Sequence, residues 1–290
     1  MKYYDSHAHI DLFLQKMGLL DHGREFDLED ISQNDITYLK YDKNELELYI
    51  SNHELIIQPT ISTNNFYLNF KLFSSDPRFV FLLGSHPDMV NDDFDSDSYL
   101  EKQAICIDFI KVNNLIQKKQ IVGIGEVGLD YYHVRTEIGQ VKQRDFFRSQ
   151  IELTISLQIP LVIHCRDAFI DLFTILAEYP AINGRFLIHC FTGGVGELEE
   201  VLKLGGKISL GGVTTYSSAK GLQEAVKICP IESFVFETDL PFLSPVPKRG
   251  EVCQPEFIDF TAQFVADLRE VSKEEAWIET RKNLKNLFGV

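Results

Sequence analysis

Two histidines near the start of the chain, His7 and His9, are separated by one residue in an apolar segment typical of a β-strand. Side chains alternate between the faces of a strand, so both imidazoles are expected to project to the same side, as two ligands of one metal ion must. Asp5 shares their parity and is expected to orient one of these histidines. A His-x-His motif alone is too short to establish a metal site, so matching ligands are needed from other strands.

Four more side chains of metal-binding type follow later apolar segments. They are Glu126 in GIGEV, His164 in LVIHC, His189 in FLIHC and Asp239 in VFETD. A lone histidine at a strand end is more often a hydrogen-bonded core residue than a ligand. Six such residues on five segments, all at the same end, instead predict one shared site.

The chain alternates strand-like and helical segments. Strand-like segments are predicted at residues 3–9, 55–60, 79–86, 121–127, 160–164, 186–189, 207–210 and 234–238. Helical spacing is predicted at residues 97–118, 141–157, 168–178, 197–204, 221–228, 256–268 and 273–288. Eight strands alternating with helices predict a single-domain (β/α)8 TIM barrel over residues 1–290, whose active site lies at the carboxyl ends of the strands. The acidic stretch at residues 13–51 is predicted to be an irregular excursion, either a surface loop or a lid.

Nitrogen and oxygen donors of this kind suit Zn²⁺, Mn²⁺ or Mg²⁺. Six protein groups exceed what one catalytic metal ion with an open position would use. Two ions with one bridging carboxylate are therefore expected, and Glu126 is the predicted bridge. Cys165 and Cys190 each follow an inward-facing histidine directly, so both are predicted to point away from the site towards the helices.

Length and composition indicate the class of protein that carries this site. The chain has 290 residues, of which 44% are apolar, and this is enough for a large core. It contains no apolar run of membrane-spanning length, and its first residues lack the apolar core of a signal peptide, so a cytoplasmic location without membrane association is expected. The five cysteines form no Cys-x-x-Cys pair, which argues against a disulfide framework or a zinc ribbon.

The formal net charge of −15 argues against a protein that holds duplex nucleic acid on a broad basic face. A polyanionic substrate must instead be held locally, by metal ions or by a few well-placed cations. No stable duplex-binding face is therefore expected, and the sequence predicts no oligomeric state.

Five motifs together resemble one family. They are HAH at residues 7–9, GEVGLDYY at 125–132, IHCRDA at 163–168, HCFTGG at 189–194 and ETDLPFL at 237–243. In this order they resemble the TatD-like metal-dependent deoxyribonucleases of the amidohydrolase superfamily. The resemblance implies a (β/α)8 barrel with one or two divalent metal ions that hydrolyses DNA phosphodiester bonds, in several members from the 3′ end.

The resemblance also implies roles for individual residues. The family's first metal set corresponds to His7, His9, Glu126 and Asp239, and its second to Glu126, His164 and His189. A histidine of the family that follows strand three corresponds to His86 in GSHP, which is expected to contact phosphate or support a ligand. One departure concerns the basic segment after Asp239, which here reads PVPKRGEVCQP and keeps Arg249 but carries Glu251 and Val252 in place of two cations. The long stretch at residues 13–51 is a second departure.

The expected chemistry is metal-assisted hydrolysis, with Glu126 and Asp239 as the catalytic carboxylates. Asp239 is expected to accept the proton of the attacking water as general base. Arg166, Lys248 and Arg249 are candidates for holding phosphate oxygens, with DNA ends as the expected partner. Two alternatives stay open at this point. One is an amidohydrolase acting on a C–N or ester bond, such as an aminoacyl ester of a tRNA, and the other is a non-catalytic metal-binding barrel.

Overall fold

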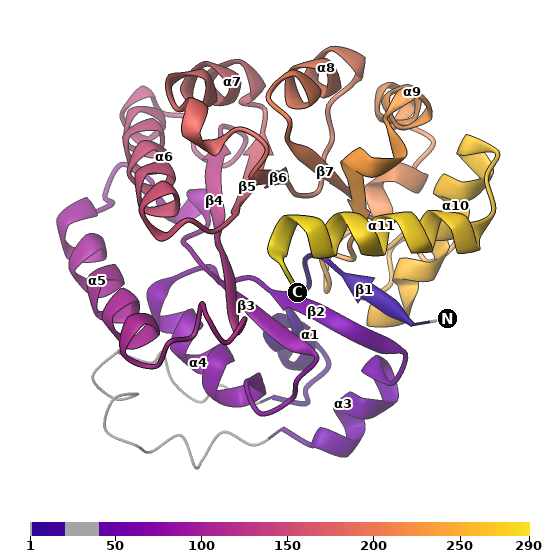
Figure 1. Ribbon diagram of the computed structural model, residues 1–290, viewed down its shortest axis with the longest axis horizontal. Coiled ribbons are helices and arrows are strands. Elements are labelled where there is room, and N and C mark those ends of the chain that lie inside the picture. Colours follow the sequence, from indigo (N-terminus) through magenta and orange to yellow (C-terminus); the bar gives the residue numbers. More distant parts are fainter. Residues whose placement is uncertain (1, 21–40) are drawn as a thin grey trace.

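The fold is a parallel barrel, seen in a computed structural model that describes residues 2–20 and 41–290. Its eight strands form one parallel sheet in the order β1 to β8 (Figure 1). The strands are β1 Tyr3–Asp5, β2 His53–Gln58, β3 Phe79–Leu83, β4 Ile121–Asp130, β5 Leu161–Arg166, β6 Phe186–Ile188, β7 Lys207–Leu210 and β8 Phe234–Phe236. The backbone N–H of Ser6 donates to the carbonyl of Phe236 over 3.1 Å, which brings the first strand next to the last. The predicted (β/α)8 barrel is confirmed.

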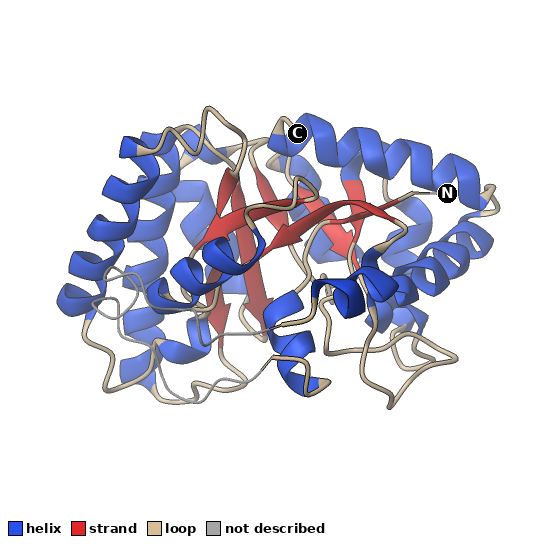
Figure 2. Ribbon diagram, turned by 90° about the horizontal axis from the view of Figure 1, so that it is seen from below, coloured by secondary structure: helices blue, strands red, loops and turns tan. Residues whose placement is uncertain are grey.

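Helices surround the strands on the outside of the barrel (Figure 2). The α-helices of the described residues are α1 Ile10–Lys16, α3 Lys43–Ile50, α4 Thr63–Phe73, α5 Ser96–Val112, α6 Glu137–Leu157, α7 Phe169–Glu178, α8 Val195–Lys203, α9 Lys220–Ile228, α10 Ile258–Arg269 and α11 Lys273–Phe288. Polar N-caps begin several of them. The hydroxyl of Thr136, for example, accepts from the N–H of Gly139 at the start of α6. This N–H has no acceptor within the helix itself.

Two buried clusters follow from the alternation of side chains along the strands. The larger cluster lies between the strands and the outer helices. The smaller one contains Leu55 and Ile57 of β2 together with Leu284 and Phe288 of α11. Helix α11 crosses the centre of the barrel in the view of Figure 1, so it closes the end at which the strands begin. Only the opposite end, where the strands finish, is left for a site.

The structure corrects several predicted boundaries. Strand β1 ends at Asp5, so His7 and His9 follow it rather than belong to it. Helix α4 was not predicted, because three asparagines interrupt the apolar spacing of its sequence TNNFYLNFKLF. The prediction of an irregular stretch at residues 13–51 was wrong at both ends, where α1 and α3 form. Residues 21–40 of that stretch lie outside the described residues, and the lid role stays a prediction.

None of the helices in the described part of the chain is both long enough and apolar enough to cross a membrane.

Candidate metal centre

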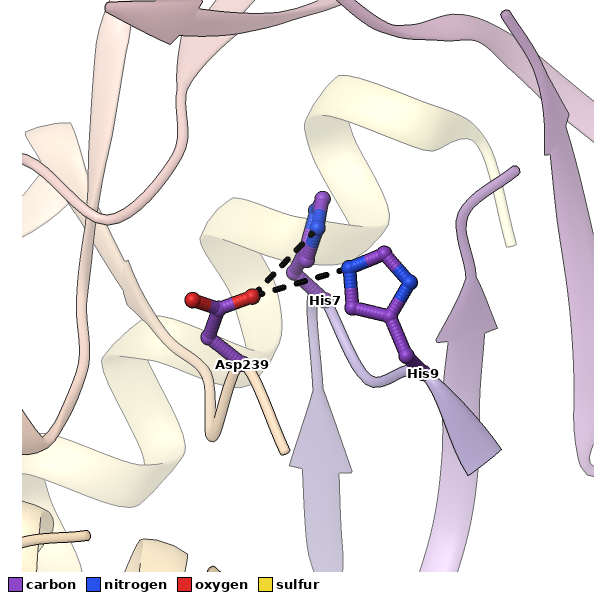
Figure 3. A group of neighbouring side chains, drawn as sticks. All are labelled: His7, His9 and Asp239. Atoms are coloured by element: carbon purple, nitrogen blue, oxygen red, sulfur yellow. Dashed lines mark ion pairs between the residues drawn. The ribbon is translucent and has the colours of Figure 1, made fainter. Parts of the chain in front are cut away.

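His7 and His9 project towards one carboxylate at the mouth of the barrel. Figure 3 shows both imidazoles beside Asp239, whose Oδ1 lies 3.8 Å from Nε2 of His7 and 3.7 Å from Nε2 of His9. Between them the N–H of Ala8 donates to the carbonyl of Ile57, and the two rings share a side as predicted.

Asp239 is fixed by the backbone of the first segment. Its N–H donates to the carbonyl of His7 over 2.9 Å. Its φ of 56° lies in the left-handed region, which aspartate tolerates better than most residues. The chain therefore turns at the end of β8, and the carboxylate faces the two histidines.

Glycines allow the neighbouring strands to approach Glu126 closely. A Cβ atom on Gly84, after β3, would collide with the backbone of Gly125. Gly128 has a φ of 148°, and a Cβ there would collide with the carbonyl of His164 on β5. These contacts explain the GIGEVG sequence around Glu126, which is 2% exposed in the interior of the mouth.

The two carboxylate oxygens of Glu126 face different histidines. Its Oε2 lies 3.2 Å from Nε2 of His7 and 3.5 Å from Nε2 of His9. Its Oε1 lies 2.7 Å from Nε2 of His189 and 2.9 Å from Nδ1 of His164. Glu126 therefore lies between the two predicted ligand sets, as a bridging carboxylate would.

The electrostatics of this cluster centre on the buried charge of Glu126. Burial alone would raise the pKa of Glu126, but His189, His86 and His7 hold it well below its usual value. Burial lowers the pKa of His7 well below its usual value, and the neighbouring His189 lowers it further. Glu126 raises the pKa of His9, and Asp130 and Glu126 raise that of His164, both against the effect of burial. Metal binding requires these imidazoles to be neutral, so a metal ion would compete with protons for them.

The donor set fits a divalent metal ion. The rings of His7 and His189 are stacked with their centroids 3.9 Å apart, so protonating both would place two positive charges together. Ligand atoms of His7, His9 and Asp239 lie within 4.8 Å of one another, as do those of His7, Glu126 and His189. The mixture of imidazole and carboxylate donors within each group suits Zn²⁺ or Mn²⁺. That these six side chains bind metal stays a prediction.

Two expectations about neighbouring residues were wrong. Among the described residues the Asp5 carboxylate has no imidazole as a partner; it accepts from the N–H of His7, and from the N–H and hydroxyl of Thr238. Cys190 lines the cavity instead of facing the helices. Strand β6 ends before it, and its φ of 43° breaks the alternation on which the prediction rested. Cys165 is 7% exposed and belongs to the outer core, as predicted, although it also reaches the cavity wall.

The cluster lies in a cavity of about 710 Å³. His86 and Arg166, two of the predicted substrate contacts, line it. Nδ1 of His86 lies 2.6 Å from Asp88 and its Nε2 lies 3.3 Å from Glu126. Burial opposes protonation of this ring, but the charge of Glu126 and the contact with Asp88 raise its pKa to about 10. His86 also shares a candidate metal-binding group with Asp130 and His164, so its role as a phosphate contact stays a prediction.

The other two predicted substrate contacts lie elsewhere. Lys248 and Arg249 are absent from the residues that line the cavity in the described structure. The ammonium group of Lys248 lies 3.3 Å from Glu251, the acidic residue that departs from the family pattern. The guanidinium of Arg249 lies 4.3 Å from the centre of the Tyr216 ring. In the described structure each of these cations thus contacts a partner outside the metal centre.

The comparison with known proteins identifies the family. The sequence profile of TatD related DNases matches residues 4–289. The chain belongs to the TatD family. It is a TatD family metal-dependent hydrolase with candidate metal-binding side chains.

YabD of Bacillus subtilis is 37% identical over 183 residues, 63% of this chain and 71% of YabD. YcfH of Escherichia coli K12 is 32% identical over 225 residues, 77% of this chain and 79% of YcfH. Both are named uncharacterized metal-dependent hydrolases.

More distant similarities extend the comparison. The human 3′-5′ RNA nuclease TATDN2 is 35% identical over 61% of this chain, which corresponds to 24% of that protein. Among solved structures, the TatD homologue YjjV of Escherichia coli has a TM-score of 0.76 at 22% identity, covering 99% of this chain and 98% of its own. A TatD family hydrolase of Entamoeba histolytica has a TM-score of 0.77 at 21% identity, with the same coverage of both chains. Identities this low establish the fold alone.

In this TatD family chain one site residue escaped the sequence prediction. Asp130 ends β4, is fully buried, and lies 3.0 Å from Nε2 of His164 and 2.8 Å from Nδ1 of His133 through the same oxygen. Residues 126, 128 and 130 share one face of a strand. Extending β4 to Asp130 would therefore have placed this carboxylate beside Glu126.

Proposed function

We propose that this TatD family hydrolase is a deoxyribonuclease that hydrolyses phosphodiester bonds at DNA ends, removing nucleotides from the 3′ end. The observation that carries the proposal is the convergence of four imidazoles and two carboxylates at one cavity, whose wall includes all of them except the buried His7. The family description as TatD related DNases supports the choice of substrate. One or two Mg²⁺, Mn²⁺ or Zn²⁺ ions are the proposed cofactors, held by His7, His9, Glu126, His164, His189 and Asp239.

A divalent cation bound by these residues would polarise a phosphoryl oxygen and bring the pKa of a water molecule to about 7. Asp239 is the proposed general base. Burial raises the pKa of its carboxyl group, against the lowering by His189 and His9, and a more basic carboxylate is better suited to accept the proton of the attacking water.

Two cationic side chains on the cavity wall are proposed to hold the phosphate. The guanidinium of Arg166 lies 4.0 Å from the centre of the Tyr132 ring, which presents it at the mouth. His86, whose two ring nitrogens face Asp88 and Glu126, is proposed to attract the phosphate by its charge. A charge-assisted hydrogen bond from Arg166 would orient the phosphodiester over the two carboxylates.

RNA is a second candidate substrate, because the human relative TATDN2 is named a 3′-5′ RNA nuclease. The test is a substrate panel in the presence of Mg²⁺, Mn²⁺ or Zn²⁺. It contains 5′-labelled single-stranded DNA, RNA of the same sequence, an aminoacyl ester and small amides. Stepwise shortening of the DNA is expected. If only RNA is shortened, RNA replaces DNA as the proposed substrate. Turnover of the ester or the amides alone would overturn the nuclease proposal.

The substitution Asp239→Asn tests the general base. Loss of proton transfer is expected to lower kcat by about 10²- to 10⁴-fold. Metal content by elemental analysis should stay near that of the unaltered protein, since His7, His9 and Glu126 remain. Asp167→Asn is a matched control, because this residue lines the same cavity outside the cluster and its loss should leave kcat unchanged. Retained turnover in Asp239→Asn would remove Asp239 as the base.

A further inference from the structure

A large aromatic side chain is exposed beside the metal centre. Phe242 follows β8, three residues after Asp239, and is 51% exposed. It lines the cavity, and its ring approaches His9 at 6.3 Å between centroids with an angle of 76° between the planes. Because this ring lines the cavity and is half in solvent, a ligand in the cavity could bury its exposed face.

The backbone holds this ring in a defined place. The N–H of Phe242 donates to the carbonyl of Asp239 over 3.0 Å, and the N–H of Asp239 donates to the carbonyl of His7. The ring is therefore coupled to the same backbone that positions the proposed base. Its neighbour Leu243 is 39% exposed and lines the same cavity, as do Leu12 and Val213. This side of the mouth is apolar.

The opposite side of the mouth carries charge. Arg166 ends β5, and its partner Tyr132 follows β4, whereas Phe242 and His9 follow β8 and β1. In a barrel with strand order β1 to β8, the boundary between β4 and β5 faces the boundary between β8 and β1. A ligand that spans the mouth would thus meet a cation on one side, carboxylates and imidazoles in the middle, and an aromatic ring on the other.

We propose that Phe242 is the platform on which the nucleobase next to the cleaved phosphodiester stacks. This inference rests on the proposed nuclease function and adds the substrate class, an end whose base is unpaired and free to leave its own stack. Every nucleobase has a π-face, so such a platform binds without selecting sequence. A paired terminal base must first separate from its partner to reach the ring.

The experiment compares Phe242 variants on single-stranded DNA with a normal 3′ end and on the same strand with both terminal nucleotides abasic. Stacking on an aromatic side chain corresponds to about a 5- to 150-fold effect. Phe242→Ala is expected to lower kcat/KM by that factor on the normal end and by less than about twofold on the abasic end. Phe242→Trp should retain the activity on the normal end, and Phe242→Leu should not.

Phe260→Ala is the matched control, since this phenylalanine is 38% exposed on α10 and does not line the cavity. Metal content and the midpoint of thermal unfolding are measured for every variant, so that a folding defect is recognised. An equal loss on normal and abasic ends, or no loss in Phe242→Ala, overturns the stacking inference while leaving the nuclease intact. Failure of the unaltered protein to shorten any strand overturns the proposed function instead.

Discussion

At the scale of single residues, the second partner of His164 decides which of its nitrogens is free to bind a metal ion. His164 points Nδ1 towards Glu126 and Nε2 towards Asp130. Donation of the Nε2 proton to the Asp130 carboxylate leaves a lone pair on Nδ1, on the side of Glu126. A carboxylate that fixes the tautomer of a ligand histidine in this way also raises its basicity.

The substitution Asp130→Asn is expected to weaken metal binding by the ligand set Glu126, His164 and His189 about 10- to 100-fold. The asparagine keeps the shape of the side chain but loses the charge that holds the Nε2 proton. Metal affinity is measured by competition with a chelator, independently of turnover. His133→Ala is the control, because this exposed ring contacts the same carboxylate without facing Glu126. Unchanged affinity in Asp130→Asn would refute the orienting role.

At the scale of elements, the junction between β1 and β8 carries half of the candidate site. The barrel closes there through few backbone hydrogen bonds, and Asp5 strengthens the junction by accepting from three donors on His7 and Thr238. The sequence argument placed Asp5 on the face of the two histidines, but Asp5 is in register with Ile56 of the outer cluster. The sequence could not indicate that the carboxylate meets Thr238, because that residue is 233 positions away along the chain.

The substitution Asp5→Ala is expected to lower the free energy of unfolding by about 3 kcal/mol, because it leaves buried donors of His7 and Thr238 without an acceptor. Urea unfolding of the metal-free protein measures the change, so that loss of bound metal does not contribute. Asp145→Ala serves as the control: its side chain is 73% exposed, and a change below about 0.5 kcal/mol is expected. Equal stability of the two variants would show that the Asp5 carboxylate does not stabilise the junction between β1 and β8.

At the scale of the whole molecule, charge limits how a polyanion can be held. A net charge of −15 offers no general attraction for a phosphate backbone. Two cations, Arg166 and protonated His86, line the cavity, while Lys248 is paired with Glu251. Binding of a nucleic acid end should therefore depend on a few local contacts.

The salt dependence of kcat/KM on single-stranded DNA measures the number of those contacts. Each neutralised phosphate contributes a slope of about −0.7 on a double-logarithmic plot. Two or three contacts predict a slope between about −1.4 and −2.1, at a constant concentration of free divalent cation. Arg166→Gln should make the slope shallower by about 0.7. A slope steeper than about −4 would indicate a broad binding face and contradict the local mode.

The sequence by itself determined the barrel class and the set of side chains at its mouth, because strand alternation and strand-then-helix order are local patterns. It also carried the motifs of the family. It did not predict α4, whose asparagines obscure the helical spacing. Only the tertiary structure decided that each oxygen of Glu126 faces a different pair of histidines. It also decided that Lys248 and Arg249 do not line the cavity and that Phe242 does. These features depend on loop paths and rotamers, which are set by contacts between residues far apart in the chain.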